Sequence, residues 1–260
     1  MSTADVNMGR EAAIQVRSFS HYFGDFRAVR DLDLDVYRNE ILAVIGPAGS
    51  GKSTFLCSLN RLNDLIPGSR SDGRIIIDGR DIFDPDTDVV ALRRRLGMVF
   101  ATPVALPRSI FENVVFGPRM AGLSDRTALE ELARDSLEKA GLWEEVKDRL
   151  GHSALHLSGG QQQRLCLARI LALKPEFILL DEPTSGLDPV STMKIEDSLR
   201  KLKQAFTIVL VTNNTKQAAR VSDRTAFFLS GELVEVGPTD RFFTVPVDSR
   251  TDEYLRGVFG

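Results

Sequence analysis

The stretch GPAGSGKST, residues 46–54, decides the fold of this 260-residue chain. It fits the pattern G-x-x-x-x-G-K-[ST] of a phosphate-binding loop, follows the apolar run Ile41–Ile45 and precedes a helical pattern. In a strand–loop–helix unit, glycines let backbone N–H groups approach phosphates, and the helix N-terminus is positive. A glycine-rich turn without a ligand is the alternative, which this context disfavours. The predicted phosphate-binding residues are Gly46, Pro47, Ala48, Gly49, Ser50, Gly51, Lys52, Ser53 and Thr54.

Two side chains of this loop and two strand-end carboxylates carry the predicted chemistry. We expect Lys52 to reach the β- and γ-phosphates and Ser53 to bind Mg²⁺. A second buried-strand pattern, Phe177–Leu180, is followed by Asp181 and Glu182. A strand-end aspartate holds Mg²⁺ in nucleotide hydrolases, and a neighbouring carboxylate can take a proton from the attacking water. We therefore predict Asp181 as a metal ligand and Glu182 as the catalytic base, with a solvated carboxylate pair as the alternative.

A second anion-binding segment is predicted at LSGGQQQR, residues 157–164. Ser158 is an N-cap type of residue, and Gly159 and Gly160 expose backbone N–H groups at the start of a helical pattern. Simple helix capping is the alternative. One chain thus carries two predicted anion-binding segments. A single nucleotide bound within one protomer need not contact both of them.

Strand and helix patterns alternate along the chain, which predicts an α/β core with a mainly parallel sheet. Period-2 alternation at Leu32, Leu34 and Val36 predicts a half-buried strand near the N-terminus. The segment 124–140 has a helical pattern with Ser124 as its expected N-cap. Two later strands, 225–229 and 232–236, are expected to form a hairpin at Ser230–Gly231.

The predicted organisation is one domain at residues 14–260, after a flexible N-terminus at 1–13. Within it, residues 14–101 and 157–260 form the nucleotide-binding core, and residues 102–156 form an inserted helical subdomain.

Composition excludes several classes of protein. The chain has 33 basic and 36 acidic residues, a net charge of −3, so no long-range attraction to nucleic acid is expected. No apolar run approaches the roughly 20 residues that span a bilayer, and the N-terminus lacks a signal-peptide core. We therefore expect any work at a membrane to pass through a membrane-embedded partner.

The motifs together resemble the ATP-binding cassette of ABC transporters. LSGGQQQR is followed by the strand-end DEP and by Ser185-Gly186-Leu187-Asp188, and the resemblance extends from about residue 14 to the end. Several stretches look most like the ATPase subunit of bacterial phosphate importers: YFGDFRAV, PRSIFENVVFGPR, LWEEVKDRL, DEPTSGLDP, QAARVSDRTAFF and TDEYLRGVFG. The resemblance implies an α/β, ABC-type P-loop nucleotide hydrolase core with an antiparallel β subdomain and an inserted helical subdomain.

The family also implies partners and residue roles. It implies a head-to-tail homodimer that sandwiches two ATP molecules, in which Ser158 and Gly160 donate to the γ-phosphate across the interface. Asp188 would lie at the dimer seam, and Phe23 matches the aromatic position that stacks on adenine. Transmembrane permease subunits are the implied partners, with a periplasmic or extracellular phosphate-binding protein acting indirectly. The implied place is the cytoplasmic face of the cell membrane.

Two positions depart from the family pattern. A glutamine that contacts Mg²⁺ and the attacking water is replaced by Ala101, and a catalytic histidine that holds the γ-phosphate is replaced by Asn213. Ala101 offers no polar group, and Asn213 cannot carry charge. We expect ATP binding and dimerisation to be preserved better than turnover. The alternatives are an ATP-binding regulatory subunit with little hydrolysis, and a non-transport ABC ATPase of DNA repair or translation.

Overall fold

The computed structural model describes residues 11–258. The predicted flexible N-terminus lies outside the described residues as far as position 10. Strand β1 begins at Ala12, two residues before the predicted domain boundary, because the side chains of Ala13 and Ile14 are buried against the core.

The larger sheet has six strands in the order β10-β9-β3-β8-β7-β6. All neighbouring pairs are parallel except β9 and β10, so the predicted mainly parallel sheet is confirmed. The predicted hairpin joins β9 to β10 through Ser230 and Gly231, whose φ values of 52° and 87° suit a two-residue turn. The bounds are β3 Ile41–Ile45, β6 Leu96–Val99, β7 Phe177–Asp181, β8 Thr207–Val211, β9 Arg224–Leu229 and β10 Glu232–Pro238.

The smaller sheet is antiparallel and has the order β2-β1-β4-β5. Its strands are β1 Ala12–Phe23, β2 Phe26–Tyr37, β4 Ser69–Ile77 and β5 Arg80–Asp81. Leu32, Leu34 and Val36 are all buried, as their alternation with aspartates predicts. Helix α1 (Lys52–Leu59) packs between the two sheets, because Phe55, Leu56 and Leu59 share one apolar cluster with residues of both.

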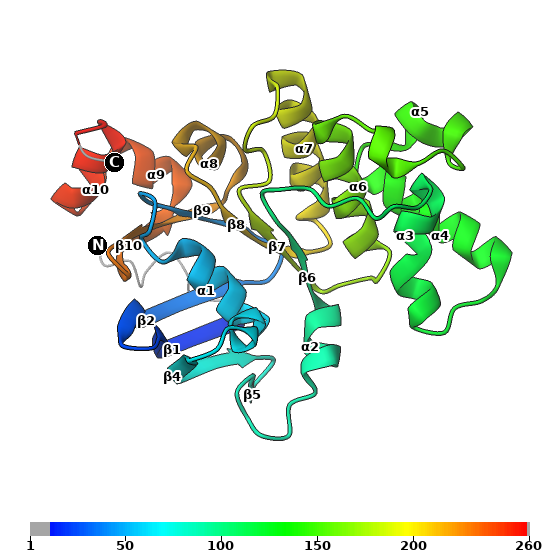
Figure 1. The fold of residues 1–260 in the computed structure, drawn as a ribbon. Coiled ribbons are helices and arrows are strands. Elements are labelled where there is room, and N and C mark those ends of the chain that lie inside the picture. Colours follow the sequence, from blue (N-terminus) through cyan, green and yellow to red (C-terminus); the bar gives the residue numbers. More distant parts are fainter. Residues whose placement is uncertain (1–10, 259–260) are drawn as a thin grey trace.

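Helices cover the opposite face and the edge of the larger sheet (Figure 1). Helices α6 (Gly159–Leu171), α7 (Pro189–Leu202) and α8 (Thr215–Val221) share an apolar cluster with β3, β7 and β8. The C-terminal helices α9 (Thr239–Thr244) and α10 (Ser249–Leu255) pack beside β9, and α2 (Val89–Arg95) leads into β6.

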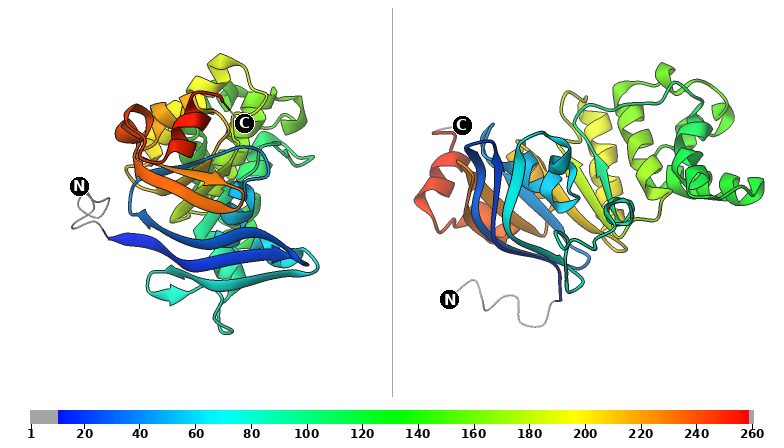
Figure 2. Two further views of the ribbon diagram at one scale, coloured as in Figure 1. Left: turned by 90° about the vertical axis from the view of Figure 1, so that its left-hand side faces the viewer. Right: turned by 60° about the horizontal axis from the view of Figure 1, so that its bottom comes forward.

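A group of helices lies at one end of the molecule, away from the C-terminal helices (Figures 1 and 2). It contains α3 (Ile110–Met120), α4 (Arg126–Lys139), α5 (Trp143–Val146) and short 3₁₀ turns at 147–149 and 154–156. The helix predicted at 124–140 is present, but its N-cap is Asp125 rather than Ser124, because the Asp125 side chain accepts from the Ala128 amide. No helix among residues 11–258 is long and apolar enough to cross a membrane.

Candidate functional site

The loop after β3 is built on two glycines whose backbone no other residue could adopt without displacement. Gly46 and Gly51 have φ values of 151° and 96°. A Cβ on Gly46 would lie 2.1 Å from the Phe228 carbonyl oxygen, and one on Gly51 would lie 2.6 Å from the Ala28 carbonyl oxygen. The loop therefore passes tightly between β9 and β2 and carries backbone, not side chains, at these points.

Lys52 lies inside this loop and is 6% exposed. Its ammonium group donates to the carbonyl oxygens of Gly46 at 2.7 Å and Pro47 at 2.8 Å. Burial lowers the pKa of Lys52, while the nearby carboxylates of Glu182 and Asp181 act to raise it. Lys52 is also the first residue of α1, and a buried cation at a helix N-terminus is suited to an anionic ligand such as a phosphate chain.

The two residues predicted to bind Mg²⁺ come together in the structure. The Ser53 hydroxyl donates to Asp181 Oδ1 at 3.0 Å. Burial raises the pKa of Asp181, and Ser53 and Lys52 act in the opposite direction. Two hard oxygen ligands fit Mg²⁺, which in nucleotide sites completes its shell with water and substrate phosphates. Among the described residues there is no group of three or more His, Cys, Asp or Glu that could hold a metal.

Glu182, the predicted base, follows β7 in a left-handed backbone conformation with φ 48°. Its amide donates to the Val211 carbonyl at 2.9 Å, and the Asn213 amide hydrogen-bonds its carboxylate. Burial raises the pKa of Glu182, against the effects of Asn213 and Lys52. Its Oε1 is buried and has no hydrogen-bond partner among residues 11–258. A carboxylate with a raised pKa and an unpaired oxygen is well suited to accept a proton.

The two departures from the family pattern lie beside these groups. Asn213 follows β8, is exposed, and reaches Glu182 through its backbone amide. Ala101 lies two residues after the end of β6, and next to it the Phe100 carbonyl accepts from Gln163 Nε2 at 2.8 Å.

The predicted second anion-binding segment forms the N-terminus of α6. Ser158 is the N-cap, and its hydroxyl accepts from the Gln161 amide at 3.4 Å. In return, Gln161 Oε1 accepts from the Ser158 amide at 3.1 Å, which completes a capping box. Ser158 is exposed, and its hydrogen bonds within residues 11–258 stay inside this first helical turn.

Asp188 caps a neighbouring helix. Its carboxylate accepts from the Ser191 amide at 2.9 Å, and the Ser191 side chain, followed by this amide, lowers the pKa of Asp188. Gly160 of α6 lies directly against α7, because a Cβ on Gly160 would lie 2.3 Å from Ser191 Oγ. The two segments that the resemblance assigns to the dimer interface are therefore in contact within one chain.

Phe23, the predicted adenine-stacking residue, ends β1 and is half-buried. Its ring meets His21 edge-on, with centroids 4.8 Å apart, and its strand partner across the turn is Phe26. The side chain of Phe26 is 64% exposed, so the hairpin carries a second accessible aromatic ring that sequence reasoning did not single out.

Three further polar residues near these segments were missed from the sequence. Gln163 and Gln217 are buried, and within the described part of the chain the Oε1 of each has no hydrogen-bond partner. Gln217 Nε2 donates to Thr184 Oγ1 at 2.9 Å, two residues beyond Glu182. Glu145 accepts from Gln161 next to Ser158. Only the polar character of these residues at helix positions facing the core could have drawn attention to them.

Comparison with known proteins places this geometry in context. The sequence profile described as ABC transporter matches residues 29–185 of the chain. The ATP-binding cassette MJ0796, solved as a dimer in a post-hydrolysis state bound to ADP and Pi, is 29% identical with a TM-score of 0.74. The match covers 87% of this chain and 98% of that one.

Two further solved structures share the fold at lower identity. CbiO1 from Clostridium perfringens, part of the ABC transporter complex CbiONQ, is 24% identical with a TM-score of 0.80, covering 94% of this chain and 95% of that one. A bacterial Atm1-family ABC exporter with ATP bound is 24% identical with a TM-score of 0.79. Here the match covers 97% of this chain but 42% of the exporter, so the exporter chain contains much more than this domain.

Proposed function

The chain belongs to the ABC transporter family, and from this premise we propose that it is the ATP-binding and hydrolysing subunit of an importer. In this proposal it works as a homodimer beneath a membrane permease at the cytoplasmic face of the membrane. The observation that carries the proposal is a partly buried cluster of four side chains. In it Ser53 hydrogen-bonds Asp181, and Lys52 interacts electrostatically with Asp181 and Glu182.

The cluster supports hydrolysis of the β–γ bond of ATP. Lys52 and the loop amides would hold the β- and γ-phosphates, and Ser53 and Asp181 would hold Mg²⁺, which would offset the charge of the phosphate oxygens. Glu182 accepts a proton from water as the water oxygen bonds to the γ-phosphorus and the bridging P–O bond breaks. ADP and inorganic phosphate are the products. The Asn213 amide keeps the Glu182 carboxylate oriented during this step.

The exposed N-terminus of α6 supports the homodimer. Ser158 and Gly160 offer donors at a positive helix end, but Ser158 bonds only within its own turn among the described residues. A second copy placed head to tail brings a γ-phosphate to this end, with Asp188 at the seam. MJ0796, which is solved as a dimer with ADP and Pi, offers a precedent for this assembly.

Mixing two defective variants tests the dimer. Ser158→Arg blocks the α6 end, and Lys52→Ala damages the phosphate loop. In a mixed dimer, one composite site keeps both halves intact, so the mixture should retain ATP better than either variant alone. Absence of recovery would argue against the head-to-tail arrangement.

A second candidate function is an ATP-binding regulatory subunit with little hydrolysis. Ala101 supplies no polar group beside Phe100, and Asn213 reaches Glu182 only through its backbone amide. Steady-state phosphate release by the purified protein with saturating MgATP separates the two candidates, because a regulatory subunit would bind MgATP without sustained release.

We further propose inorganic phosphate as the imported solute, with a phosphate-binding protein acting outside the membrane. This rests on the resemblance of segments such as 217–228 and 251–260 to phosphate importers. Cells whose only copy carries Lys52→Ala should lose uptake of radiolabelled phosphate and keep uptake of a labelled amino acid. Loss of a different solute, or no loss, would contradict this assignment; a DNA-repair or translation defect instead would favour a non-transport ABC ATPase.

A further inference from the structure

Glu145, near the end of α5, receives donors from two different helices. From α6, Arg164 contacts its Oε1 at 2.7 Å and its Oε2 at 3.2 Å, and Gln161 Nε2 donates to Oε2 at 2.9 Å. From α7, the Lys194 ammonium lies 2.6 Å from Oε1. These contacts, with Arg164 foremost, lower the pKa of Glu145 to about 2. The carboxylate is therefore ionised at neutral pH and joins both helices.

On the α6 side, Glu145 determines how the Gln161 amide faces. Gln161 Nε2 donates to Glu145, and its Oε1 is thereby turned to the Ser158 amide, where it accepts at 3.1 Å. A rotated amide would place its NH₂ group against the Ser158 N–H group, and the capping box would be lost. The orientation of Ser158 thus depends on a residue that touches no part of the phosphate loop in the contacts of residues 11–258.

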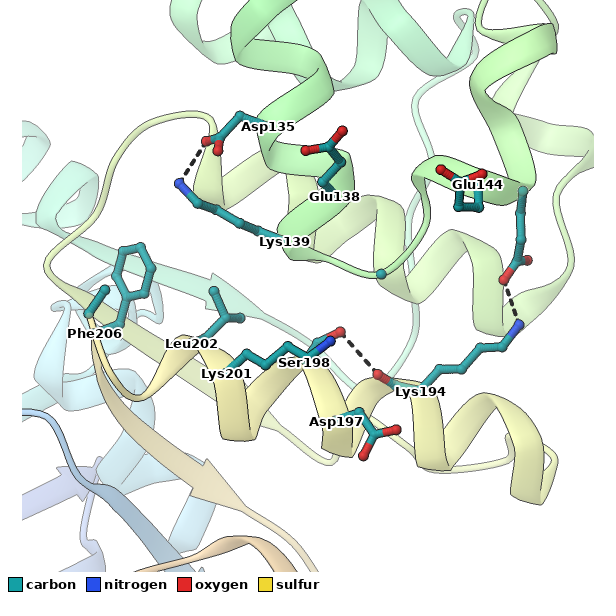
Figure 3. Close-up of a pocket in the computed structure, with 13 residues that line it drawn as sticks. Asp135, Glu138, Lys139, Glu144, Lys194, Asp197, Ser198, Lys201, Leu202 and Phe206 are labelled. Atoms are coloured by element: carbon teal, nitrogen blue, oxygen red, sulfur yellow. Dashed lines mark hydrogen bonds and ion pairs between the residues drawn. The ribbon is translucent and has the colours of Figure 1, made fainter.

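On the α7 side, Lys194 and Glu145 both line a cleft of about 600 Å³ between α4–α5 and α7, and their ion pair joins the two walls of this cleft (Figure 3). Close to this ion pair, Gly141 packs against α7, since a Cβ there would lie 2.9 Å from Ser198 Oγ. Asp188 is the N-cap of α7, and Gly160 abuts the first turn of this helix at Ser191. Glu145 therefore connects α6, which begins after Ser158, to α7, the helix that Asp188 caps.

Arg164 holds the Glu145 carboxylate in place between α5 and α6. It is 2% exposed, and it also donates to the carbonyl oxygens of Gly141 at 2.6 Å and Gly160 at 3.2 Å. A buried guanidinium with fixed partners holds the carboxylate in one place, because an unpaired charge there is costly.

We propose that Glu145 is a positioning residue that sets Ser158 and the start of α7 together toward the nucleotide held by a second copy of the chain. This rests on the homodimer proposed above. The effect is in trans: the Glu145 of one copy serves the ATP bound by the other.

The first test compares Glu145→Gln with the matched control Glu144→Gln. Glu144 is the neighbouring residue and is also ion-paired, to Lys147, but its side chain is 77% exposed and its pairing stays outside α6 and α7. Both variants are made in a Glu182→Gln background, which stops hydrolysis. We expect Glu145→Gln to weaken MgATP-driven dimerisation about tenfold, the scale of one lost charged hydrogen bond, with the MgATP affinity of the monomer unchanged. Equal dimerisation of both variants would overturn the proposal.

The second test separates a trans effect from general damage. Glu145→Gln is mixed with Lys52→Ala, both in the Glu182→Gln background, and MgATP retained on the dimer after gel filtration is measured. One composite site then combines an intact loop with an intact Glu145, so retention should recover as it does with the Ser158→Arg and Lys52→Ala mixture. Recovery with Ser158→Arg but not with Glu145→Gln would refute the role of Glu145 and keep the homodimer. Failure of both mixtures would remove the homodimer, and this inference with it.

A variant that does not fold would be replaced by Glu145→Asp. Aspartate keeps the charge beside Arg164 but is one methylene shorter, so it withdraws from Gln161 or Lys194. The same loss of dimerisation and the same recovery in the mixture are expected, and wild-type dimerisation of Glu145→Asp would overturn the proposal.

Discussion

The loop at residues 46–54 buries its charged side chain, whereas the N-terminus of α6 leaves Ser158 at the surface. Lys52 in the loop has a lowered pKa, and Asp181 and Glu182 at the end of β7 have raised pKa values, in each case chiefly through burial. At α6 the polar groups take part in an ordinary capping box. The cluster of Lys52, Asp181 and Glu182 therefore has the perturbed pKa values expected of a reactive site. The N-terminus of α6 has only a capped helix end, so in the proposed homodimer it meets a nucleotide that the second copy holds.

Among the variants considered, loss of Lys52 should have the largest effect, and it should act on nucleotide binding by the loop at residues 46–54. Lys52→Ala removes the cation that lies among the loop carbonyls, so MgATP affinity should fall on the order of 100-fold, or about 2.7 kcal/mol. Isothermal titration of the monomer measures it, with Lys201→Ala on the exposed face of α7 as a control. Unchanged affinity would mean that the loop does not hold phosphate.

The two departures, Ala101 and Asn213, offer a way to sharpen the comparison, since reverting them should change hydrolysis without altering Lys52 or Ser53. Ala101→Gln and Asn213→His supply an amide and a titratable ring, so each should raise steady-state turnover and the pair should raise it most, about tenfold or more. Nucleotide affinity should change much less, because Lys52 and Ser53 already hold the ground state. Turnover is assayed on the purified protein and again with the permease of the proposed importer. Flat turnover in both settings would show that both replacements are tolerated.

A single added methyl group should disrupt the contact between α6 and α7. Gly160→Ala would force a Cβ into Ser191, so the protein should lose about 1–3 kcal/mol of stability in denaturant unfolding. Gly159→Ala is the matched control for stability, because its Cβ would lie 3.6 Å from Leu187, an ordinary contact. Adding Ser191→Gly to Gly160→Ala should restore part of the loss. Equal unfolding curves for the two alanine variants would contradict the close packing.

The smallest expected effect concerns Glu182 and pH. Because its folded-state pKa is raised, its carboxyl group favours folding below the unfolded pKa and loses that contribution as pH rises through the folded pKa. Glu182→Gln should therefore stabilise the nucleotide-free protein at pH 7 by less than about 1 kcal/mol, because solvent screens this half-buried group, and the gain should fade below about pH 4. Thermal unfolding at several pH values measures it against Glu131→Gln on the exposed face of α4. A gain that grew on acidification would have the wrong sign.

Much of the fold could be predicted from the chain because its signals are local. Strands β3, β7 and β8 are apolar on consecutive positions, and the turn at Ser230–Gly231 has the residues of a hairpin. The N-cap of α4 was placed one residue early, because Ser124 and Asp125 are both good capping residues and only the backbone geometry selects Asp125. The local sequence alone does not decide which of two adjacent capping residues becomes the N-cap.

The sequence by itself determined that a glycine-rich loop with Lys52 and Ser53 follows a buried strand, since glycine spacing acts through the backbone that immediately surrounds it, and it predicted phosphate binding there. It also identified Asp181 and Glu182, because a strand end places its next residues at the sheet edge. Only the tertiary structure decided that Ser53 meets Asp181, residues 128 positions apart, and that Glu145 joins Gln161 to Lys194. Those contacts depend on how helices pack across the sheet, and packing is set by the summed shape of distant side chains rather than by any local pattern.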